Sequence, residues 1–410
     1  MAYLILKNVT LFDGTGSDPK SGMNLIVEGD RIVDVTASRK SPSALDTEID
    51  CKGKVMLPGL IDAHMHIGLI NPQMSEVVRN NHPGLMAAKM FRNLKDAIEQ
   101  GFTTARDCGG ADKGFKIAVE KGMVPGCRLI VCGPVLCQTG GHADDRMAAE
   151  DRPHTPGRIG FTGYVCNGVP EVQKGARDVL RQGSDFIKIM AGGGCASPTD
   201  PPTTSQYSPE ELRAIVFEAE SAETYVAAHC YSNRSIRLCA DAGVKTIEHG
   251  NLMDLETAKF AASKGSALIP TLPAYEMMYR LADEWGLPDY VRVKVDVVRE
   301  AGLNAIKNAM ETGMAIGLGT DLPNERHIYC GVALEQQAKV QGELGALISA
   351  TKTNAEILGI SDRLGTVEPG KLADMILVSG DPFSDISLFN NYNDNILMII
   401  KGGEVYKNII

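Results

Sequence analysis

The chain has 410 residues, too many for one small domain, since single hydrophobic cores stop growing near about 250–300 residues. Hydrophobic residues at 44% and charged residues at 22% are ordinary for globular proteins and exclude disordered and fibrous classes. The 41 basic and 51 acidic residues give a net charge of -10, which repels a phosphate backbone, so we expect no nucleic-acid partner.

Neither the N-terminus nor the cysteines indicate export or membrane insertion. The first residues lack the basic and long apolar regions of a signal peptide, and no apolar run approaches the roughly 20 residues of a spanning helix. The ten cysteines are too sparse for a disulfide scaffold and fit no zinc-ribbon spacing. We therefore expect a cytoplasmic protein with buried thiols and no membrane association.

Residues 1–57 alternate between short β-type runs and turn clusters, as do residues 360–410. The N-terminal runs cover 3–11, 24–27, 31–35 and 54–57. The C-terminal runs cover 374–378 and 397–401, and Gly402-Gly403 after the second run predicts a hairpin. We predict that both termini together form one small split β-sandwich domain, made of residues 1–57 and 360–410.

Residues 58–359 show a different rhythm, in which short apolar or β-branched runs alternate with amphipathic helical stretches. Eight such runs occur, at 59–62, 102–105, 129–132, 186–189, 225–228, 245–248, 267–270 and 315–318. The helix after the fourth run has a clear start, because Ser208-Pro209-Glu210-Glu211 reads as a capping box with a proline at the first helical position. Eight repeats over about 300 residues fit an α/β fold of the (β/α)8 TIM-barrel type, with a doubly wound sheet as the alternative.

Four of the eight histidines fall at the ends of predicted strands: His64, His66, His229 and His249, with Asp321 after the eighth run. His64 and His66 are two residues apart, so their side chains point to the same side of a strand. A barrel gathers the carboxyl ends of its strands around one mouth, so all five side chains should converge there. Imidazoles and carboxylates suit zinc and similar divalent ions, and five ligands exceed the four of a structural zinc, which favours a two-metal site.

Lys188 lies inside the fourth run, where its apolar neighbours Ile187 and Ile189 should face the helices and the lysine should face inward. A buried ammonium group is costly, so either the neutral amine becomes available or the lysine pairs with an acidic neighbour. The spacing alone leaves both possibilities open.

Several motifs, in order along nearly the whole chain, resemble the amidohydrolase superfamily. They are Pro58-Gly59-Leu60-Ile61-Asp62-Ala63-His64-Met65-His66, the Lys188 strand, His229, Glu248-His249-Gly250, Gly319-Thr320-Asp321, and Val367-Glu368-Pro369-Gly370-Lys371-Leu372-Ala373-Asp374. The resemblance implies two divalent ions, which we expect to be zinc, and a carbamate on Lys188 that bridges them. His64, His66 and Asp321 would hold one ion, and His229 and His249 the other. A bridging hydroxide would attack the scissile carbonyl, while Asp321 would pass its proton to the leaving amine.

Within that superfamily the chain resembles the metal-dependent dipeptidases related to prolidases and to imidazolone hydrolases. The relevant motifs are Gly140-Gly141-His142 and His229-Cys230-Tyr231-Ser232. We expect His142 and Tyr231 to donate hydrogen bonds to the oxyanion or to the substrate carboxylate. Arg237, or Arg234 beside it, is a further candidate for binding that carboxylate.

The resemblance favours a small peptide substrate, most plausibly an Xaa-Pro dipeptide. We also expect the protein to be a homo-oligomer. An Xaa-Arg or Xaa-Lys dipeptidase or carboxypeptidase is the alternative. Its acidic pocket would come from residues after the seventh run, namely Glu276, Asp283, Glu284 and Asp289, unless these form a solvated helix face. Two rivals stay open: a mononuclear hydrolase of a cyclic amide or imidazolone with an unmodified Lys188, and a barrel without enzymatic activity.

Overall fold

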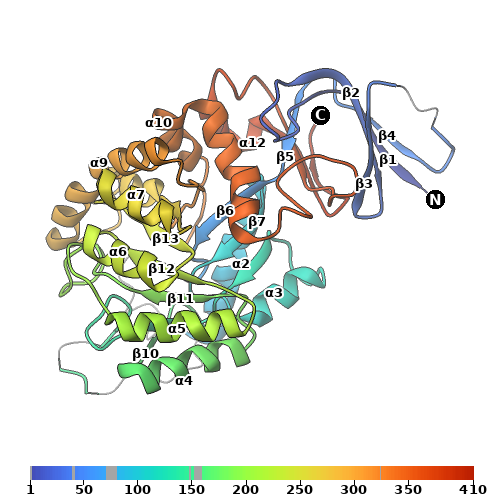
Figure 1. Ribbon diagram of the computed structural model, residues 1–410. Coiled ribbons are helices and arrows are strands. Elements are labelled where there is room, and N and C mark those ends of the chain that lie inside the picture. The colour runs from blue at the N-terminus through green and yellow to red at the C-terminus, as the bar shows by residue number, and fades with distance from the viewer. Residues whose placement is uncertain (1, 39–41, 71–80, 147–148, 152–158, 324) are drawn as a thin grey trace. The chain divides into compact units, whose positions relative to one another are not determined.

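The computed structural model describes residues 2–38, 42–70, 81–146, 149–151, 159–323 and 325–410 (Figure 1). The chain divides into two compact units. One consists of residues 1–62, 96–104 and 328–410, and the other of residues 63–95 and 105–327. Both ends of the chain therefore belong to the same unit.

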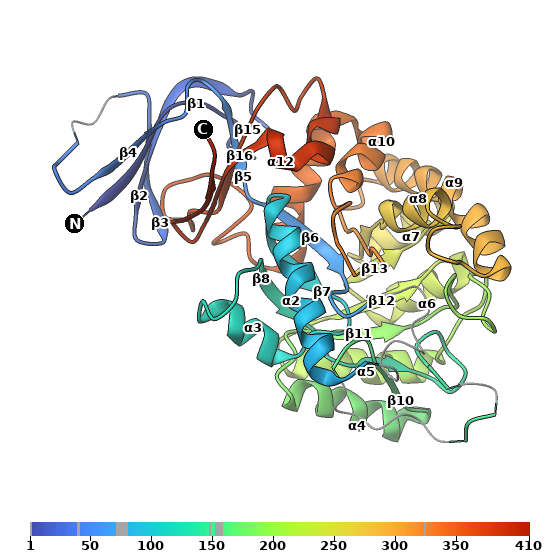
Figure 2. The ribbon, with the colours of Figure 1, turned by 180° about the vertical axis from the view of Figure 1, so that it is seen from behind.

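The first unit is built on a mostly antiparallel sheet. Its strands are β1 (Tyr3–Leu11), β2 (Lys20–Glu28), β3 (Arg31–Thr36), β4 (Thr47–Asp50), β5 (Val55–Pro58), β15 (Met375–Val378), β16 (Ile396–Lys401) and β17 (Glu404–Asn408). Their order is β17-β16-β15-β5-β1-β2-β3, with β4 paired to β1. Because β15 pairs with β5, strands from the two ends of the chain lie side by side, as the red and blue strands in Figures 1 and 2 show. The predicted sandwich arrangement and its boundaries stay predictions.

The same unit has an apolar core to which both ends of the chain contribute. Leu6, Leu25 and Met56 from the N-terminal strands pack with Met375 and Ile400 from the C-terminal strands. The predicted hairpin is confirmed, since Gly402 and Gly403 have φ values of 56° and 78° between β16 and β17. Such positive φ angles are easy for glycine and costly for other residues.

The parallel strands fall into two groups. The first contains β6 (Leu60–Met65), β7 (Phe102–Asp107) and β8 (Arg128–Val131). The second contains β9 (Val135–Cys137), β10 (Gly163–Val165), β11 (Ile187–Met190), β12 (Val226–Cys230), β13 (Thr246–His249) and β14 (Ala267–Ile269), in the order β10-β9-β11-β12-β13-β14. Seven of the eight predicted runs are thus strands, which confirms an α/β fold with parallel sheets.

The eighth predicted run, 315–318, is not a full strand, and among the described residues it forms an isolated bridge between Leu268 and Ile316. It is nevertheless hydrogen-bonded on both sides. The Leu268 N–H donates to Ala315 O at 2.9 Å, and the Ala63 N–H donates to Leu318 O at 2.9 Å. The segment is therefore hydrogen-bonded both to β14 and to β6.

Helices alternate with the parallel strands. They are α2 (Pro83–Glu99), α3 (Lys113–Glu120), α4 (Gly168–Arg181), α5 (Pro209–Ser221), α6 (Asn233–Ala242), α7 (Leu255–Ser263), α8 (Leu272–Arg280) and α9 (Asp289–Thr312). Near the C-terminus follow α10 (Val332–Ile348), the π-helix η1 (Ser349–Thr353), α11 (Asn354–Leu358), the 3-10 helix η2 (Ile386–Asn391) and α12 (Tyr392–Asn395). The predicted capping box at the start of α5 is confirmed, because Ser208 and Glu211 cap each other's backbone N–H groups.

All ten cysteines are buried and none forms a disulfide, which agrees with the expectation of buried thiols. In the part of the chain that the structure describes, no helix has both the length and the apolar character needed to cross a bilayer.

Candidate metal centre and active site

Six side chains that were predicted from separate parts of the sequence meet at one place. His64 lies on β6, Lys188 on β11, His229 on β12 and His249 on β13, while His66 and Asp321 follow β6 and the eighth run. All of them except His64 line a cavity of about 380 Å³. The Nε2 atom of His64 lies 3.2 Å from Nε2 of His66, at the wall of this cavity.

His64 and His66 form the first pair of imidazoles. Their Nε2 atoms face each other and lie 3.6 Å and 3.3 Å from Oδ1 of Asp321. The outer nitrogens are held by the protein: Nδ1 of His64 lies 2.6 Å from Oε2 of Glu248, and Nδ1 of His66 donates to Gly109 O at 2.8 Å. The inner nitrogens and the carboxylate lie within 4.8 Å of one another, close enough to bind one ion.

His229 and His249 form a second pair with the same design. Nδ1 of His229 lies 2.7 Å from Nε2 of His249. The outer nitrogens again have protein partners, Gly193 O for His229 at 3.1 Å and Thr271 Oγ1 for His249 at 2.7 Å. Metal-binding histidines typically use one nitrogen for such an orienting hydrogen bond and the other for the metal.

Burial favours the neutral form of all four imidazoles. It lowers their pKa well below the usual value, to about 3 for His66, and the positive charge of Lys188 adds to the effect at His64 and His66. Neutral imidazole is the form that binds a metal ion.

Lys188 points into the cavity, as predicted, and its Nζ atom is buried without a hydrogen-bond partner among the described residues. The predicted alternative, an ion pair with an acidic neighbour, is not found within the described part of the chain. An isolated buried ammonium group is costly. Conversion to a carbamate would turn it into an anion beside four imidazoles, which fits a site for divalent ions.

The sequence analysis did not predict that Glu248 and Arg106 hold the imidazole of His64 in place. Glu248 accepts from Nδ1 of His64 through one oxygen and from Arg106 through the other, at 2.7 Å, and all three side chains are buried. Although burial lowers the pKa of Arg106, the charge of Glu248 outweighs it and the pKa is raised. The signal in the sequence that could have indicated this pair was a charged residue within each of two buried strands, Arg106 in β7 and Glu248 in β13.

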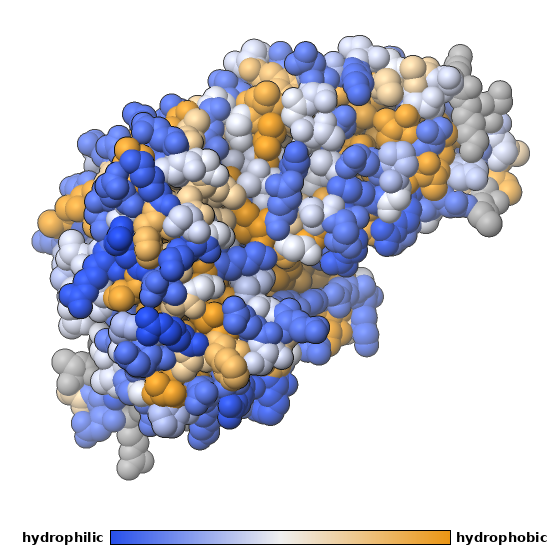
Figure 3. Space-filling view, in the orientation of Figure 1, coloured by the Kyte–Doolittle hydropathy of each residue, from blue (hydrophilic) through white to orange (hydrophobic). Residues whose placement is uncertain are grey.

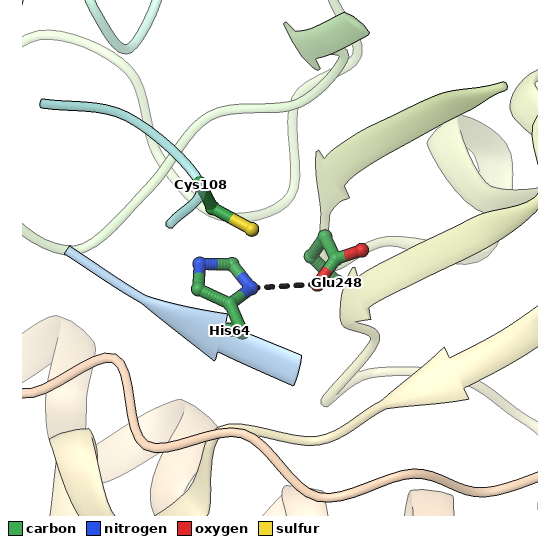
Figure 4. Close-up of side chains that lie close together, drawn as sticks. All are labelled: His64, Cys108 and Glu248. Carbon is green, nitrogen blue, oxygen red and sulfur yellow. Dashed lines mark hydrogen bonds and ion pairs between the residues drawn. The ribbon is translucent and has the colours of Figure 1, made fainter. Parts of the chain in front are cut away.

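Cys108 lies beside this pair, and Figure 4 shows the imidazole of His64 turned toward Glu248, with Cys108 close to both. This group does not fit a further metal site. Both oxygens of Glu248 already have partners, and burial raises the pKa of the Cys108 thiol to about 12, which keeps it protonated.

Two site residues have strained backbones. His249 and Asp321 have φ values of 73° and 51°, in the left-handed region that side chains rarely adopt. Hydrogen bonds hold Asp321 in this conformation, since its N–H and that of Thr320 both donate to His64 O, at 2.8 and 3.0 Å.

Two of the predicted substrate-binding residues lie at the cavity. His142 stacks on His229 with ring centroids 4.4 Å apart, and Tyr231 stacks on His249 at 5.1 Å. The hydroxyl of Tyr231 is hydrogen-bonded to that of Tyr275 at 2.7 Å.

Arg237 does not lie at the cavity. It is exposed on α6, with its guanidinium 4.3 Å from the ring centroid of Phe260, and it is not among the described residues that line the cavity. The helix turns this side chain outward, so the structure does not support the predicted role in binding a substrate carboxylate.

The predicted acidic pocket is not formed either. None of Glu276, Asp283, Glu284 and Asp289 is among the lining residues. Glu276 pairs with Arg280 and Arg299, and Asp283 is 95% exposed and pairs with Arg292. The same segment instead contributes an apolar wall, made of Tyr275, Met278, Leu287, Pro288, Tyr290 and Val291.

Comparison with known proteins places this site in a family. The Amidohydrolase family model matches residues 55–406. A crystal structure of an amidohydrolase superposes with a TM-score of 0.95 at 38% identity and covers 99% of both chains. That of a prolidase in complex with N-methylphosphonate-L-proline has a TM-score of 0.95 and 35% identity, and covers 99% of this chain and 100% of the other.

A curated relative agrees with this assignment. Ochratoxinase of Aspergillus niger is 31% identical over 369 residues, which span 86% of this chain and 76% of the relative. The chain therefore belongs to the amidohydrolase family and is a hydrolase that acts on carbon–nitrogen bonds.

Proposed function

We propose that this protein is a binuclear metal-dependent dipeptidase that cleaves Xaa-Pro dipeptides. The observation that carries the proposal is the arrangement of four imidazoles in two pairs, each ring with its outer nitrogen held by the protein and its inner nitrogen turned toward its partner. The similarity to a prolidase that was solved with an L-proline phosphonate supports the choice of substrate class.

The residues present fit two divalent ions, which we propose to be zinc. His64, His66 and Asp321 would hold one ion and His229 and His249 the other, with Lys188 as a carbamate between them. The buried Nζ atom of Lys188, which lacks a hydrogen-bond partner among the described residues, supports that modification. When bound, such ions supply a water activated for attack at neutral pH and polarise the scissile carbonyl.

The chain's own residues would carry the proton and orient the substrate. The Asp321 carboxylate, 17% exposed at the cavity wall, would accept a proton from the attacking water and deliver it to the leaving amine. His142 would contact the substrate through Nε2, because its Nδ1 is hydrogen-bonded to Ser197. Tyr231, whose ring stacks on that of His249, would donate a hydrogen bond to the oxyanion or to the substrate carboxylate.

One part of the cavity wall favours an apolar dipeptide, while Asp144, Asp145 and Arg146 line another part. Met278, Leu287, Pro288 and Val291 offer a surface that suits a proline ring or an aliphatic side chain, and no acidic residue from the segment 276–289 faces it among the described residues. A basic C-terminal residue would lose its hydration there without gaining a partner from this segment.

A panel of dipeptides, assayed together with metal analysis of the same sample, tests the proposal. We expect Xaa-Pro dipeptides to be cleaved faster than Xaa-Arg, Xaa-Lys and cyclic amides, and two metal ions to be bound per chain. Cleavage of cyclic amides alone by a protein with one ion per chain would contradict it, and so would the absence of dipeptide hydrolysis in the fully loaded protein.

We also propose that the parallel strands and the segment 315–318 close into a (β/α)8 barrel over residues 58–359. The two hydrogen bonds that connect this segment with β14 and β6 support closure. Residues 1–57 and 360–410 would form the small β-sandwich domain, which the shared core of both termini supports.

Finally, we propose a cytoplasmic homo-oligomer. On the face drawn in Figure 3, hydrophobic and hydrophilic residues are intermixed. A contact between copies of the chain would therefore involve exposed apolar side chains on individual helices. On α9, Val293 and Val297 are 64% and 55% exposed one helical turn apart, which supports such a contact. Sedimentation of the wild type and of a Val293→Glu variant tests it.

A further inference from the structure

His142 belongs to a network of hydrogen-bonded polar groups that take no direct part in the proposed reaction. Its backbone N–H donates to Gln206 Oε1 at 3.2 Å, and Gln206 Nε2 donates to Asp200 Oδ2 at 3.0 Å. That same carboxylate oxygen lies 3.4 Å from Nδ1 of His142. His142, Asp200 and Gln206 are each at most 9% exposed.

Ser197 is the fourth member of this network and determines the direction of its hydrogen bond with His142. Its hydroxyl donates to Asp200, so its oxygen is left to accept from Nδ1–H of His142, at a distance of 2.9 Å. The other ring nitrogen, Nε2, has no hydrogen-bond partner among the described residues, and the side chain lines the cavity. Nε2 is thus the nitrogen that a substrate meets, and in the neutral imidazole with its hydrogen on Nδ1 this nitrogen accepts a hydrogen bond.

The imidazole is also fixed by close packing. A Cβ atom added at Gly194 would lie 2.0 Å from Cε1 and 2.4 Å from Nδ1 of His142, so only glycine leaves room for the ring in this position. A Cβ atom at Gly141 would lie 2.6 Å from Gln206 Oε1. The imidazole of His142 therefore cannot rotate unless the loop that follows β11 moves.

That loop is held by one cation. The Nζ atom of Lys294, on α9, donates to the carbonyl oxygens of Gly194 at 3.0 Å, Ser197 at 2.7 Å and Asp200 at 3.2 Å. These are the three loop residues whose packing or side chains contact His142. Their carbonyls can all point to one ammonium group only when the loop has this shape.

From these contacts we propose that Asp200 and Lys294 are positioning residues for His142. Lys294 fixes the loop, Asp200 and Ser197 hold Nδ1–H, and Nε2 is thereby presented to the substrate at the wall of the cavity. The inference rests on the proposed dipeptidase function, because it assigns His142 a contact with the substrate.

A double-mutant cycle on the metal-loaded protein tests this assignment. We expect Lys294→Met and Asp200→Asn each to lower kcat/KM for an Xaa-Pro dipeptide by about 10- to 100-fold, mainly through kcat, with two metal ions retained. In a His142→Ala background, the same substitutions should change the rate less than about 2-fold, since nothing is left to position. Losses that multiply in that background would overturn the proposal.

Lys307→Met is the matched control, because Lys307 is exposed on the same helix; it should leave kcat/KM unchanged. Should Lys294→Met fail to fold, Asp200→Asn still completes the cycle.

A spectroscopic measurement separates this inference from the proposed function. In protein labelled with ¹⁵N-histidine, the His142 signal, identified by its loss in His142→Ala, should show a hydrogen on Nδ1 in the wild type and a changed distribution between the nitrogens in Asp200→Ala. If no dipeptide is cleaved but this change is seen, the dipeptidase function fails and the positioning role stands. If dipeptides are cleaved and the His142 signal does not depend on Asp200, the positioning role fails.

Discussion

Arg106 and Glu248 illustrate how single buried residues determine the geometry of the metal centre. Glu248 orients the imidazole of His64, and Arg106 compensates the charge of Glu248 while also donating to Ala63 O. The ligand atom that His64 offers is therefore set by two residues that would not touch a metal ion. Removing the guanidinium would leave a buried carboxylate without its counter-ion.

We predict that Arg106→Met weakens metal binding about 10- to 100-fold. It should also lower the free energy of unfolding by about 3–5 kcal/mol, because an uncompensated buried charge remains. Metal titration and urea unfolding measure the two effects. Arg213→Met, which removes an exposed partner of the exposed Asp241, is the control and should change neither. Tight metal binding in Arg106→Met would contradict the supporting role of the pair.

A second prediction concerns Lys188. Replacing it with alanine should abolish hydrolysis, because the proposed bridging anion is lost, and a small carboxylate such as acetate should restore part of the activity by entering the space left behind. Lys188→Arg keeps the positive charge but cannot form a carbamate, and it leaves no space, so it should be inactive with and without acetate. Activity and metal content of Lys188→Ala equal to those of the wild type would exclude the carbamate.

Two reciprocal hydrogen bonds stabilise the start of α5. Ser208 Oγ accepts from the N–H of Glu211 at 3.3 Å, and Glu211 Oε2 accepts from the N–H of Ser208 at 2.7 Å. Two N–H groups that the helix itself cannot satisfy thus have partners. This helix follows the loop that carries Ser197 and Asp200, but it contributes no residue to the cavity lining.

We expect Ser208→Ala to lower the free energy of unfolding by about 1 kcal/mol. Ser221→Ala, at the exposed far end of α5, serves as the control and should have a smaller effect. Because α5 does not line the cavity, kcat should be unchanged in both variants. Urea unfolding followed by circular dichroism, together with the dipeptide assay, measures this. A Ser208→Ala variant as stable as the wild type would show that the capping box contributes nothing here.

The sequence allowed prediction of the strands and of the convergence of their ends. Strand periodicity and turn residues are local signals, and parallel strands bring distant ends together, so His64 and Asp321 could be placed at one site. Contacts that depend on three-dimensional neighbours could not be predicted. The pairing of Arg106 with Glu248 and the outward direction of Arg237 follow from the packing of particular helices and strands, which no local pattern encodes.

At the scale of the whole molecule, the buried imidazoles make the metal-free protein sensitive to acid. In the folded apoprotein their pKa lies well below the usual value, whereas in the unfolded chain it returns to about 6.5. As the pH falls below this value, the unfolded state binds protons that the folded state does not. Folding is then progressively disfavoured.

Because of these imidazoles, the free energy of unfolding of chelator-treated protein should fall below about pH 6.5, by up to about 1.4 kcal/mol per pH unit for each imidazole. Urea unfolding at several pH values measures the slope. His249→Asn should reduce this slope by the contribution of one proton, about 1.4 kcal/mol per pH unit. His82→Asn, a substitution of an exposed histidine, should leave the slope unchanged. A slope that is the same in His249→Asn and in the wild type would contradict the neutral, buried state of this ring.

The position of β5 between β15 and β1 has a consequence for how the chain is made. β5 leaves the ribosome early, whereas the strand that covers its other edge is synthesised only near the end of translation. Until then β5 carries unpaired backbone groups at its open edge, which can recruit strands from other chains. Nascent or C-terminally shortened chains should thus depend on chaperones that shield this edge.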